Sequence, residues 1–296
     1  MTLNTDNFLH YLEREKRYSA HTILAYHNDL QQFTDYLSDQ YGIDEISVAT
    51  APMIRSWLAG AMQQGLSRTS INRKLSTLKS YFRYAGRRDP DLKNPMEKVG
   101  SLKKNKVLPV FVEEEGMNQL LDRSVFEPGF AGQRDRLMLE MLYTTGMRLS
   151  ELIGLQHHDF DTEKNTIKVT GKGAKQRIVP VIQEVSDHYD DYCLEKEKEF
   201  GLSVSGHIFV TNKGSKIYPK FVYRLVNAYL SKVTTRSRKS PHVLRHTFAT
   251  HMLNHGADLN AIKEILGHAS LSATQVYTHN SIEKIKNVYK QAHPKA

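Results

Sequence analysis

The spacing of apolar residues is the sequence feature that most strongly constrains the fold of this chain. From residue 3 to about 86, apolar side chains recur at helical spacing, for example at Leu75, Leu78, Tyr81 and Phe82. This period predicts four amphipathic helices. Residues that favour helix starts stand at the breaks between them: Ser19, Thr50 with Pro52, and Ser67. After Pro109 the period is again mostly helical, so we expect a mainly α protein.

One segment departs from the helical period. Residues 166–181 alternate apolar and polar side chains around Gly171, Lys172 and Gly173, which predicts a β-hairpin with Lys172 at its tip. The apolar run at 206–210 predicts a third short strand. The expected fold class is therefore mainly α, with a small antiparallel sheet in the second half of the chain.

A basic segment separates the two helical regions. Residues 87–109 hold three prolines, a glycine and seven lysines or arginines, a composition typical of a linker. We expect a helical domain over 1–88, a linker over 89–108 and a second domain over 109–296, which suits the chain length. The charge of the linker fits a strap around a nucleic acid duplex, and it fits a solvated connector equally well.

The charge balance favours a polyanionic partner. The chain has 41 lysines and arginines against 32 aspartates and glutamates, a formal net charge of +9. Such an excess attracts nucleic acid, although charge alone does not identify it. The single cysteine, Cys193, excludes an internal disulfide and a cysteine-based zinc site. Without a secretory signal or a run of 18 apolar residues, we expect an intracellular protein with no membrane insertion.

The segment from 240 to 279 carries the strongest chemical signal. Ser240 and Pro241 are typical of an N-cap and a first helical position, so His242 and Arg245 emerge on one face near a helix start. The helix dipole, free N–H groups, an imidazole and a guanidinium then face one point. This arrangement predicts a phosphate site.

Two further groups of residues complete the candidate site. Arg148 and Glu151 are three residues apart at a predicted loop-to-helix junction, where the carboxylate can fix the guanidinium. Downstream, Gly267 and His268 end a predicted helix, and Tyr277 follows His268 by nine residues.

The wording of these motifs resembles the tyrosine recombinases, the phage integrase family, and is most similar to the Xer branch. The resemblance lies in TGMRLSEL, GKGAKQRIVPV, HVLRHTFATHML and LGHASLSATQVYTH. The first domain resembles the family's four-helix, SAM-like core-binding domain in YSAHTILAYHNDLQQFTDYL and SRTSINRKLSTLKSYFRYA. The resemblance implies a helical catalytic domain in the second half and six catalytic residues, with Glu151 in support: Arg148, Lys172, His242, Arg245, His268 and Tyr277.

The resemblance also implies the chemistry, in which Tyr277 attacks a DNA phosphate and forms a 3′-phosphotyrosyl link. A tyrosine has a pKa of about 10, so we expect His242 to help remove its proton. We expect Lys172 to protonate the leaving 5′ oxygen, His268 to hydrogen-bond the phosphate, and the two arginines to clamp its oxygens. Because the link conserves the energy of the cut bond, a 5′ hydroxyl can reverse the step without ATP, a metal or another cofactor.

A metal site is the competing interpretation of the histidines. His242 with His246 and His251 with His255 are i, i+4 pairs, the spacing that zinc-binding helices use. The glutamate of the HExxH motif is missing, and the second pair shares a face with apolar residues of the same predicted helix. The sequence therefore favours a structural role for that pair.

The resemblance implies a site-specific recombinase that exchanges DNA strands through a Holliday junction. The chain shows no added arm-binding domain and is similar to chromosomal Xer enzymes, which resolve replicon dimers at a dif-like site before cell division. We expect the protein to act in the cytoplasm, at the nucleoid, on double-stranded DNA. It would form a tetramer there with further copies of itself or with a second Xer recombinase. A septal DNA translocase is a further expected partner. The alternatives are an integrase of a phage or mobile element, a type IB topoisomerase, and a catalytically silent DNA-binding factor.

The C-terminal residues predict a helix from about 281 with a narrow apolar stripe, formed by Ile282, Ile285 and Val288. The stripe is too small to be a core of its own, so the helix has to dock. It can pack on its own domain. The resemblance implies docking on the neighbouring subunit of a DNA-bound tetramer, which we favour.

Overall fold

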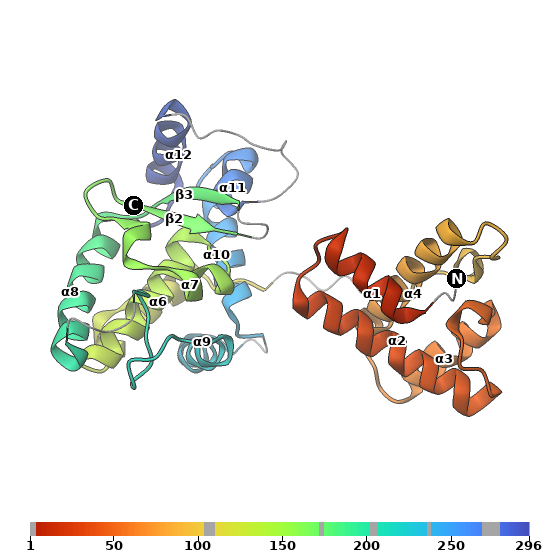
Figure 1. Cartoon of the computed structure of the whole chain (residues 1–296). Coiled ribbons are helices and arrows are strands. Elements are labelled where there is room, and N and C mark those ends of the chain that lie inside the picture. Colours follow the sequence, from red (N-terminus) through yellow and green to blue (C-terminus); the bar gives the residue numbers. More distant parts are fainter. Residues whose placement is uncertain are drawn as a thin grey trace. The chain divides into compact units, whose positions relative to one another are not determined.

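The computed structural model describes residues 4–103, 110–171, 175–201, 206–235, 238–267 and 279–295. The chain divides into two compact units, Met1–Val107 and Leu108–Ala296. Each unit has its own hydrophobic core, the property that defines a domain (Figure 1).

The first unit contains the four predicted helices: α1 Thr5–Arg14, α2 Ala20–Tyr41, α3 Ala51–Gln63 and α4 Arg68–Arg88, with a 3₁₀ turn η1 at Ile46–Val48. The predicted starts are confirmed, because Ser19 and Ser67 each accept a backbone N–H bond at the beginning of α2 and α4. Thr50 precedes α3, which has Pro52 in its first turn. The helices bury an aromatic core: Phe8, Phe33, Trp57, Tyr81 and Phe82.

The segment after α4, predicted as a linker that was either a strap around a duplex or a solvated connector, packs on the first unit over its described residues. It forms a 3₁₀-helix, η2, over Pro95–Lys98, and it buries Met96 and Val99 in the core of that unit. The Asn72 side chain donates to the Leu102 carbonyl at 2.9 Å and accepts from the Leu102 N–H at 2.9 Å. The apolar residues among the prolines and lysines explain the difference, since their burial stabilises the packed segment.

The second unit is built around α6, which spans Phe130–Thr145 and is buried along most of its length. Helices α8 and α10 pack on it (Figure 1). The other elements of the unit are α5 Glu114–Leu121, η3 Arg123–Val125, α7 Leu149–Gly154, η4 His157–Asp159, α8 Gln183–Phe200, α9 Pro219–Val233, α10 Pro241–Asn254, α11 Leu259–Leu266 and α12 His279–Ala292. None of the described helices of the chain is both long and apolar enough to span a membrane.

The small sheet confirms the predicted hairpin and corrects one strand. Its antiparallel order is β1-β2-β3, with β1 Phe160–Asp161, β2 Thr166–Thr170 and β3 Gln176–Pro180. The segment predicted as a third strand, 206–210, forms only isolated bridges instead. Its last three residues, Ile208, Phe209 and Val210, are all buried, and the Ile208 N–H donates to the Leu155 carbonyl. The apolar run therefore fills the core without joining the sheet.

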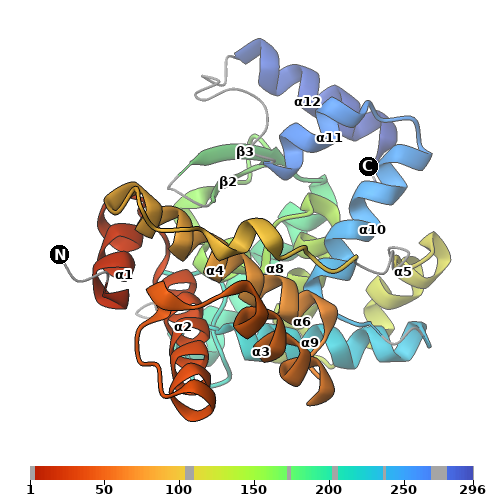
Figure 2. The ribbon, with the colours of Figure 1, turned by 90° about the vertical axis from the view of Figure 1, so that its right-hand side faces the viewer.

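Helix α12 packs on its own domain. Ile285, Tyr289 and Ala292 are buried, and the helix contacts α10, α11 and β3 (Figure 2). The sequence analysis favoured docking on a neighbouring subunit, whereas in this single chain Ile285 and Val288 of the stripe pack on the core of their own domain. Two aromatic rings of α6 and α10, Tyr143 and Phe248, supply part of the surface that receives the tail, since both contact the ring of His293.

Candidate active site

Arg148 lies where two helices meet. The chain leaves α6 at Gly146, whose φ of 59° suits glycine, and Arg148 is the N-cap of α7. The Glu151 carboxylate accepts the Arg148 backbone N–H at 2.7 Å and its guanidinium at 2.8 Å, so the contact expected between these residues is present. Another guanidinium nitrogen donates to the Gly267 carbonyl at 3.1 Å. The Arg148 side chain is nevertheless 37% exposed, which leaves part of it free to meet a ligand.

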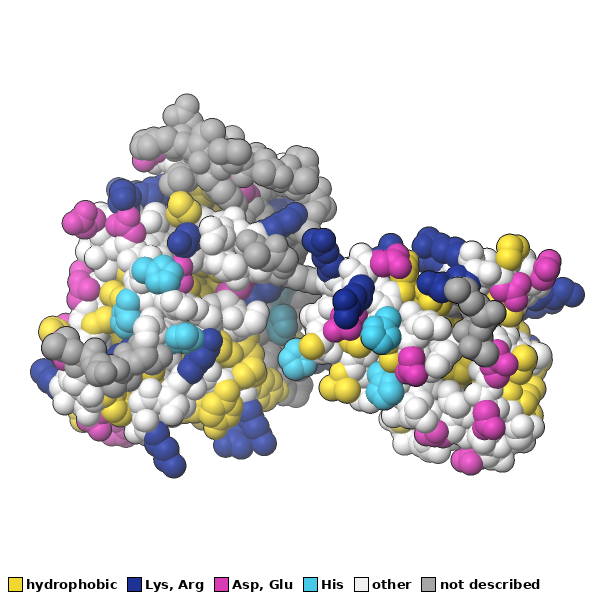
Figure 3. Space-filling view, viewed as in Figure 1, with side chains coloured by type: hydrophobic (Ala, Val, Ile, Leu, Met, Phe, Trp, Pro, Cys, Tyr) yellow, Lys and Arg dark blue, Asp and Glu magenta, His cyan; other side chains and the backbone are white. Residues whose placement is uncertain are grey.

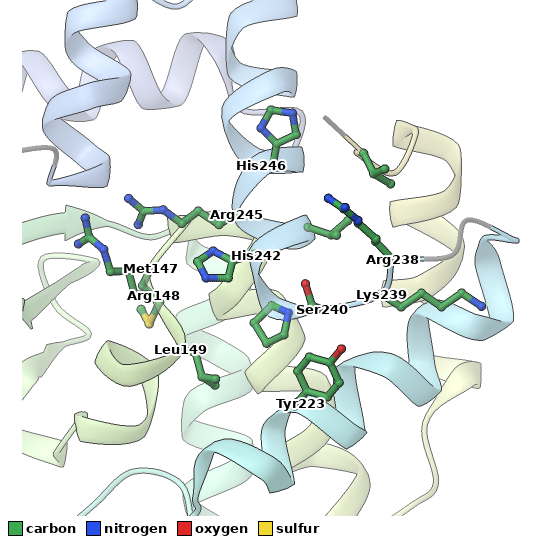
Figure 4. A pocket seen from close by; sticks show the side chains of 13 residues that line it. Met147, Arg148, Leu149, Tyr223, Arg238, Lys239, Ser240, His242, Arg245 and His246 are labelled. Atoms are coloured by element: carbon green, nitrogen blue, oxygen red, sulfur yellow. The ribbon is translucent and has the colours of Figure 1, made fainter. Parts of the chain in front are cut away.

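Helix α10 brings a second arginine to the same place. The helix begins at Pro241 with Ser240 as its N-cap, as predicted. His242 and Arg245 therefore share a face near the helix start. Figure 4 shows the guanidinium groups of Arg148 and Arg245 pointing the same way, with the imidazole of His242 beside them.

Backbone carbonyls hold Arg245 from behind. Its guanidinium donates to the Gly146 carbonyl at 2.6 Å and to the Leu266 carbonyl at 2.8 Å, so the ends of α6 and α11 fix its position. The pKa of Arg245 is lowered to about 10, mainly by burial and to a smaller extent by the positive charges of Arg148 and Arg177. The group is still charged at neutral pH, and an approaching anion would relieve the repulsion between the arginines.

A cavity of about 490 Å³ opens in front of these side chains. Among the described residues that line it, none is Asp or Glu, whereas many are basic or imidazole-bearing. A cavity with this lining favours an anion such as a phosphate. The polar and aromatic residues around it are Arg148, Tyr223, Arg238, Lys239, Ser240, His242, Arg245 and His246 (Figure 4).

Glu151 has a second cationic partner that was not predicted from the sequence. Arg177, on β3, donates from its two terminal nitrogens to the two oxygens of Glu151 at 2.8 and 2.9 Å, and its Nε donates to the Ile265 carbonyl at 2.7 Å. Burial raises the pKa of Glu151, but the bonds and charge of Arg177 and the bonds from Arg148 outweigh burial, so its pKa is lowered. A usable signal was the position of Arg177 opposite Val169 on the buried face of the hairpin, where a charge needs a partner.

Outside the described residues lie three of the predicted catalytic residues: Lys172, His268 and Tyr277. Two described glycines next to them lie close to the Arg148 site. The Gly267 carbonyl accepts a bond from Arg148, and a Cβ placed on Gly171 would lie 3.2 Å from a Glu151 oxygen. Gly171 and Gly267, which precede Lys172 and His268 in the sequence, therefore lie in the immediate surroundings of Arg148.

The four histidines of the metal interpretation have different surroundings. His242 and His246 line the cavity, whereas His251 is buried with its Nδ1 2.9 Å from the Tyr143 hydroxyl. His255 lies 2.8 Å from a carboxylate oxygen on another helix. Within the part of the chain that the structure describes, the group spaced for a metal is a different one: Glu140, Glu184 and His188.

Comparisons with known proteins identify the family. Residues 111–284 match the phage integrase family, and residues 5–89 match the N-terminal SAM-like domain of phage integrases. Tyrosine recombinase XerC of Chlorobaculum tepidum is 38% identical over 98% of this chain and 94% of its own length. Tyrosine recombinase XerC of Oceanobacillus iheyensis is 37% identical over 100% of this chain and 97% of its own length.

Solved structures show the same fold. The crystal structure of XerA recombinase is 25% identical, with a TM-score of 0.50 over 98% of both chains. XerH site-specific recombinase bound to palindromic difH substrate is 23% identical, with a TM-score of 0.71 over 90% of this chain and 78% of that chain. This chain belongs to the phage integrase family of tyrosine recombinases. It is a site-specific recombinase, an enzyme that cleaves and rejoins DNA.

Proposed function

We propose that this recombinase resolves chromosome dimers at a dif-like site, through a 3′-phosphotyrosyl intermediate and a Holliday junction. The observation that carries the cleavage chemistry is the convergence of Arg148, Arg245 and His242 on one cavity without a lining carboxylate among its described residues. Two guanidiniums fixed from behind by carbonyls are suited to charge that develops on the oxygens of a phosphodiester.

The chemistry assigns a separate task to each group. Arg148 and Arg245 clamp the non-bridging oxygens of the scissile phosphate, and His242 accepts the proton of the attacking hydroxyl. Tyr277 is the nucleophile, Lys172 protonates the leaving 5′ oxygen, and His268 hydrogen-bonds the phosphate. Glu151 touches no DNA and orients Arg148.

We further propose that α4 grips the DNA backbone. The helix carries seven lysines and arginines and no acidic residue over Arg68–Arg88. Asp29 pairs with Arg73 and Lys74, and Arg83 and others are exposed. Lysines and arginines of the first unit are dark blue in Figure 3. Cations along one helix suit the regular spacing of phosphates on a duplex.

The names of the relatives support the biological role. Several similar proteins are called XerC, and one protein of the same fold was solved with a difH substrate. We propose that this chain acts as a tetramer on DNA with further copies or with a second Xer recombinase, in the cytoplasm at the nucleoid. A septal DNA translocase is the proposed partner that starts the reaction.

The decisive experiment is to sequence DNA junctions recombined in cells that express the protein. Junctions at one chromosomal site, formed between sister copies, support dimer resolution. Junctions at the ends of a phage or mobile element instead support an integrase, and relaxed circles without recombinants support a topoisomerase.

A nicked suicide duplex of the recovered site then tests the chemistry. The wild-type protein should form a protease-sensitive adduct on the 3′ phosphate, and Tyr277→Phe should form none. Persistence of the adduct in Tyr277→Phe would remove Tyr277 as the nucleophile.

A further inference from the structure

Arg177 is a buried cation that the catalytic scheme does not use. It is 5% exposed and lies on β3 opposite Val169, with its guanidinium bonded to the two Glu151 oxygens and to the Ile265 carbonyl. All three guanidinium nitrogens of this buried arginine donate to protein groups, so these hydrogen bonds are not available to a ligand. Its effect on the reaction has to pass through its partners.

Those partners belong to the segments that carry the active site. Glu151 holds Arg148 at 2.8 Å, and a Cβ on Gly171, next to Lys172, would lie 3.2 Å from a Glu151 oxygen. At the end of α11, a Cβ on Gly267 would lie 3.1 Å from the Arg177 side chain, so the arginine packs against the backbone that leads to the next residue, His268. Arg177 therefore lies at the meeting point of the hairpin, the start of α7 and the end of α11.

The hydrogen bonds of Glu151 show how the coupling works. One of its oxygens accepts from the guanidiniums of Arg148 and Arg177, and the other accepts from the Arg148 backbone N–H and from Arg177. Each oxygen thus accepts two bonds, which fills the capacity of a carboxylate. Without Arg177, each oxygen loses one partner while the charge stays buried. The Arg148 side chain is 37% exposed, and its guanidinium is then drawn toward the carboxylate and away from the cavity.

We propose that Arg177 is a positioning residue for DNA cleavage: through Glu151 and the end of α11, it fixes the orientation in which Arg148 meets the scissile phosphate. The inference rests on the proposed function, because it takes Arg148 to contact that phosphate. It assigns a role in the reaction to a residue that never touches DNA.

The test compares two substrates in single-turnover cleavage. One is the nicked duplex of the recovered site, and the other is the same duplex with a methylphosphonate at the scissile position, which lacks one negative charge and so depends less on a guanidinium clamp. Arg177→Met should cleave the phosphodiester about 100-fold more slowly than wild type, the cost of a reacting group misplaced by about 1 Å. On the methylphosphonate, the deficit should shrink toward wild type. Arg177→Lys should be intermediate on the phosphodiester, because an ammonium cannot bind both carboxylate oxygens and the carbonyl at once.

Arg134 supplies the matched control. It is the other buried arginine of this domain among the described residues, 3% exposed, and its guanidinium pairs with Asp135 at 2.7 Å, at the opposite end of α6 from Gly146. Arg134→Met should lose stability without any gain on the methylphosphonate. Folding of each variant is followed by its unfolding midpoint.

The outcomes separate the two levels of inference. If wild type forms no adduct, the proposed function fails. If wild type forms the adduct but Arg177→Met either matches wild type or is slowed equally on both substrates, as expected for Arg134→Met, then Arg177 is merely structural and this inference is overturned.

Discussion

Arg148 and Arg245 reach one cavity from two helices, and each donates to a backbone carbonyl behind it. Replacing either with alanine should reduce cleavage of the suicide duplex by about 10²–10³-fold, the usual cost of one donor to a developing oxyanion. DNA affinity should change little, because many other phosphate contacts contribute to it. Anisotropy titrations measure the affinity and gel assays measure the adduct. Affinity that falls in proportion to cleavage would argue against a transition-state role.

Gly146 contributes both to the packing at the end of α6 and to the position of Arg245. A Cβ there would lie 2.5 Å from the Phe248 ring and 2.7 Å from Leu266, and its φ is +59°. Gly146→Ala should therefore lower the free energy of unfolding by about 2–4 kcal/mol. It should also slow cleavage, because the Gly146 carbonyl holds Arg245.

Urea titration and single-turnover cleavage check the Gly146 prediction. Gly154→Ala is the control, since a Cβ at that position meets no atom within 4 Å beyond its chain neighbours and the nearby backbone of its own helix. Equal stability of Gly146→Ala and wild type would show that the α6–α7 corner adapts more easily than its packing indicates.

Sequence predicted some residues of the site better than others, for a physical reason. His242 and Arg245 share one helix, and Arg148 and Glu151 share one helix start, so local spacing was enough to pair them. The role of Arg177 depends on the approach of α11, 88 residues further along the chain, through the Ile265 carbonyl. No local period encodes such a contact.

At the level of elements, α12 is held by a buried histidine that follows it. The His293 ring stacks on Tyr289 with centroids 4.9 Å apart and lies 5.4 Å from the Tyr143 ring. Its Nδ1 accepts the Lys295 N–H at 3.1 Å, which requires that nitrogen to be unprotonated. The pKa of His293 is lowered to about 3, mainly by burial and to a smaller extent by the charges of His251, Lys295 and His255.

This shift predicts that acid loosens the C-terminal helix. In the unfolded chain the histidine has a pKa of about 6.5, so the folded state binds fewer protons between that value and the folded pKa. The stabilisation is complete above about pH 6.5 and is lost as pH falls, by about 2 kcal/mol at pH 5. His293→Phe keeps a ring beside Tyr289 and should remove most of this pH dependence.

Urea titrations at pH 7 and pH 5 measure the effect of His293→Phe. The control is His158→Gln, because the His158 side chain is 67% exposed. If the stability of His293→Phe falls as steeply with acid as that of wild type, another group controls the dependence.

Elements with a clear period were predicted correctly, and an apolar run without one was not. The hairpin predicted within 166–181 forms its two antiparallel strands, and the four helices of the first unit follow their spacing. The run at 206–210 is buried on consecutive residues, a pattern that a strand and a core-filling loop share. Tertiary contacts with Leu155 and Tyr192 decide between them.

At the scale of the whole molecule, each of the two units has its own core. The first unit carries the basic helix α4, and the second carries the cavity lined by Arg148 and Arg245. Composition led us to expect two domains, because the basic, proline-containing segment after α4 interrupts the helical period. It did not predict that this segment packs on α3 and α4 through Met96. Burial of Met96 needs a surface that two separate helices create.

Because the two units are separate, we expect α4 to contribute to DNA affinity but not to the rate of DNA cleavage. Lys79 and Arg83 are i, i+4 neighbours on its outer side, half-buried and exposed respectively. In the double variant Lys79→Gln/Arg83→Gln, the slope of log affinity against log salt concentration should become less steep by about 1.8. Each lost phosphate contact accounts for about 0.9 of this change. Cleavage at saturating protein should stay at the wild-type rate, because neither residue belongs to the catalytic unit.

Salt titrations of DNA binding, paired with single-turnover cleavage, measure both quantities. Lys198→Gln removes a positive charge from α8, where the lysine pairs with Glu195 at 2.7 Å, and should leave the salt slope unchanged. If Lys198→Gln lowers the slope as much per charge as the α4 variant does, net charge rather than α4 accounts for the affinity. If the α4 variant cleaves slowly even when DNA is fully bound, the first unit also helps to place the scissile phosphate, and the separation of binding from chemistry fails.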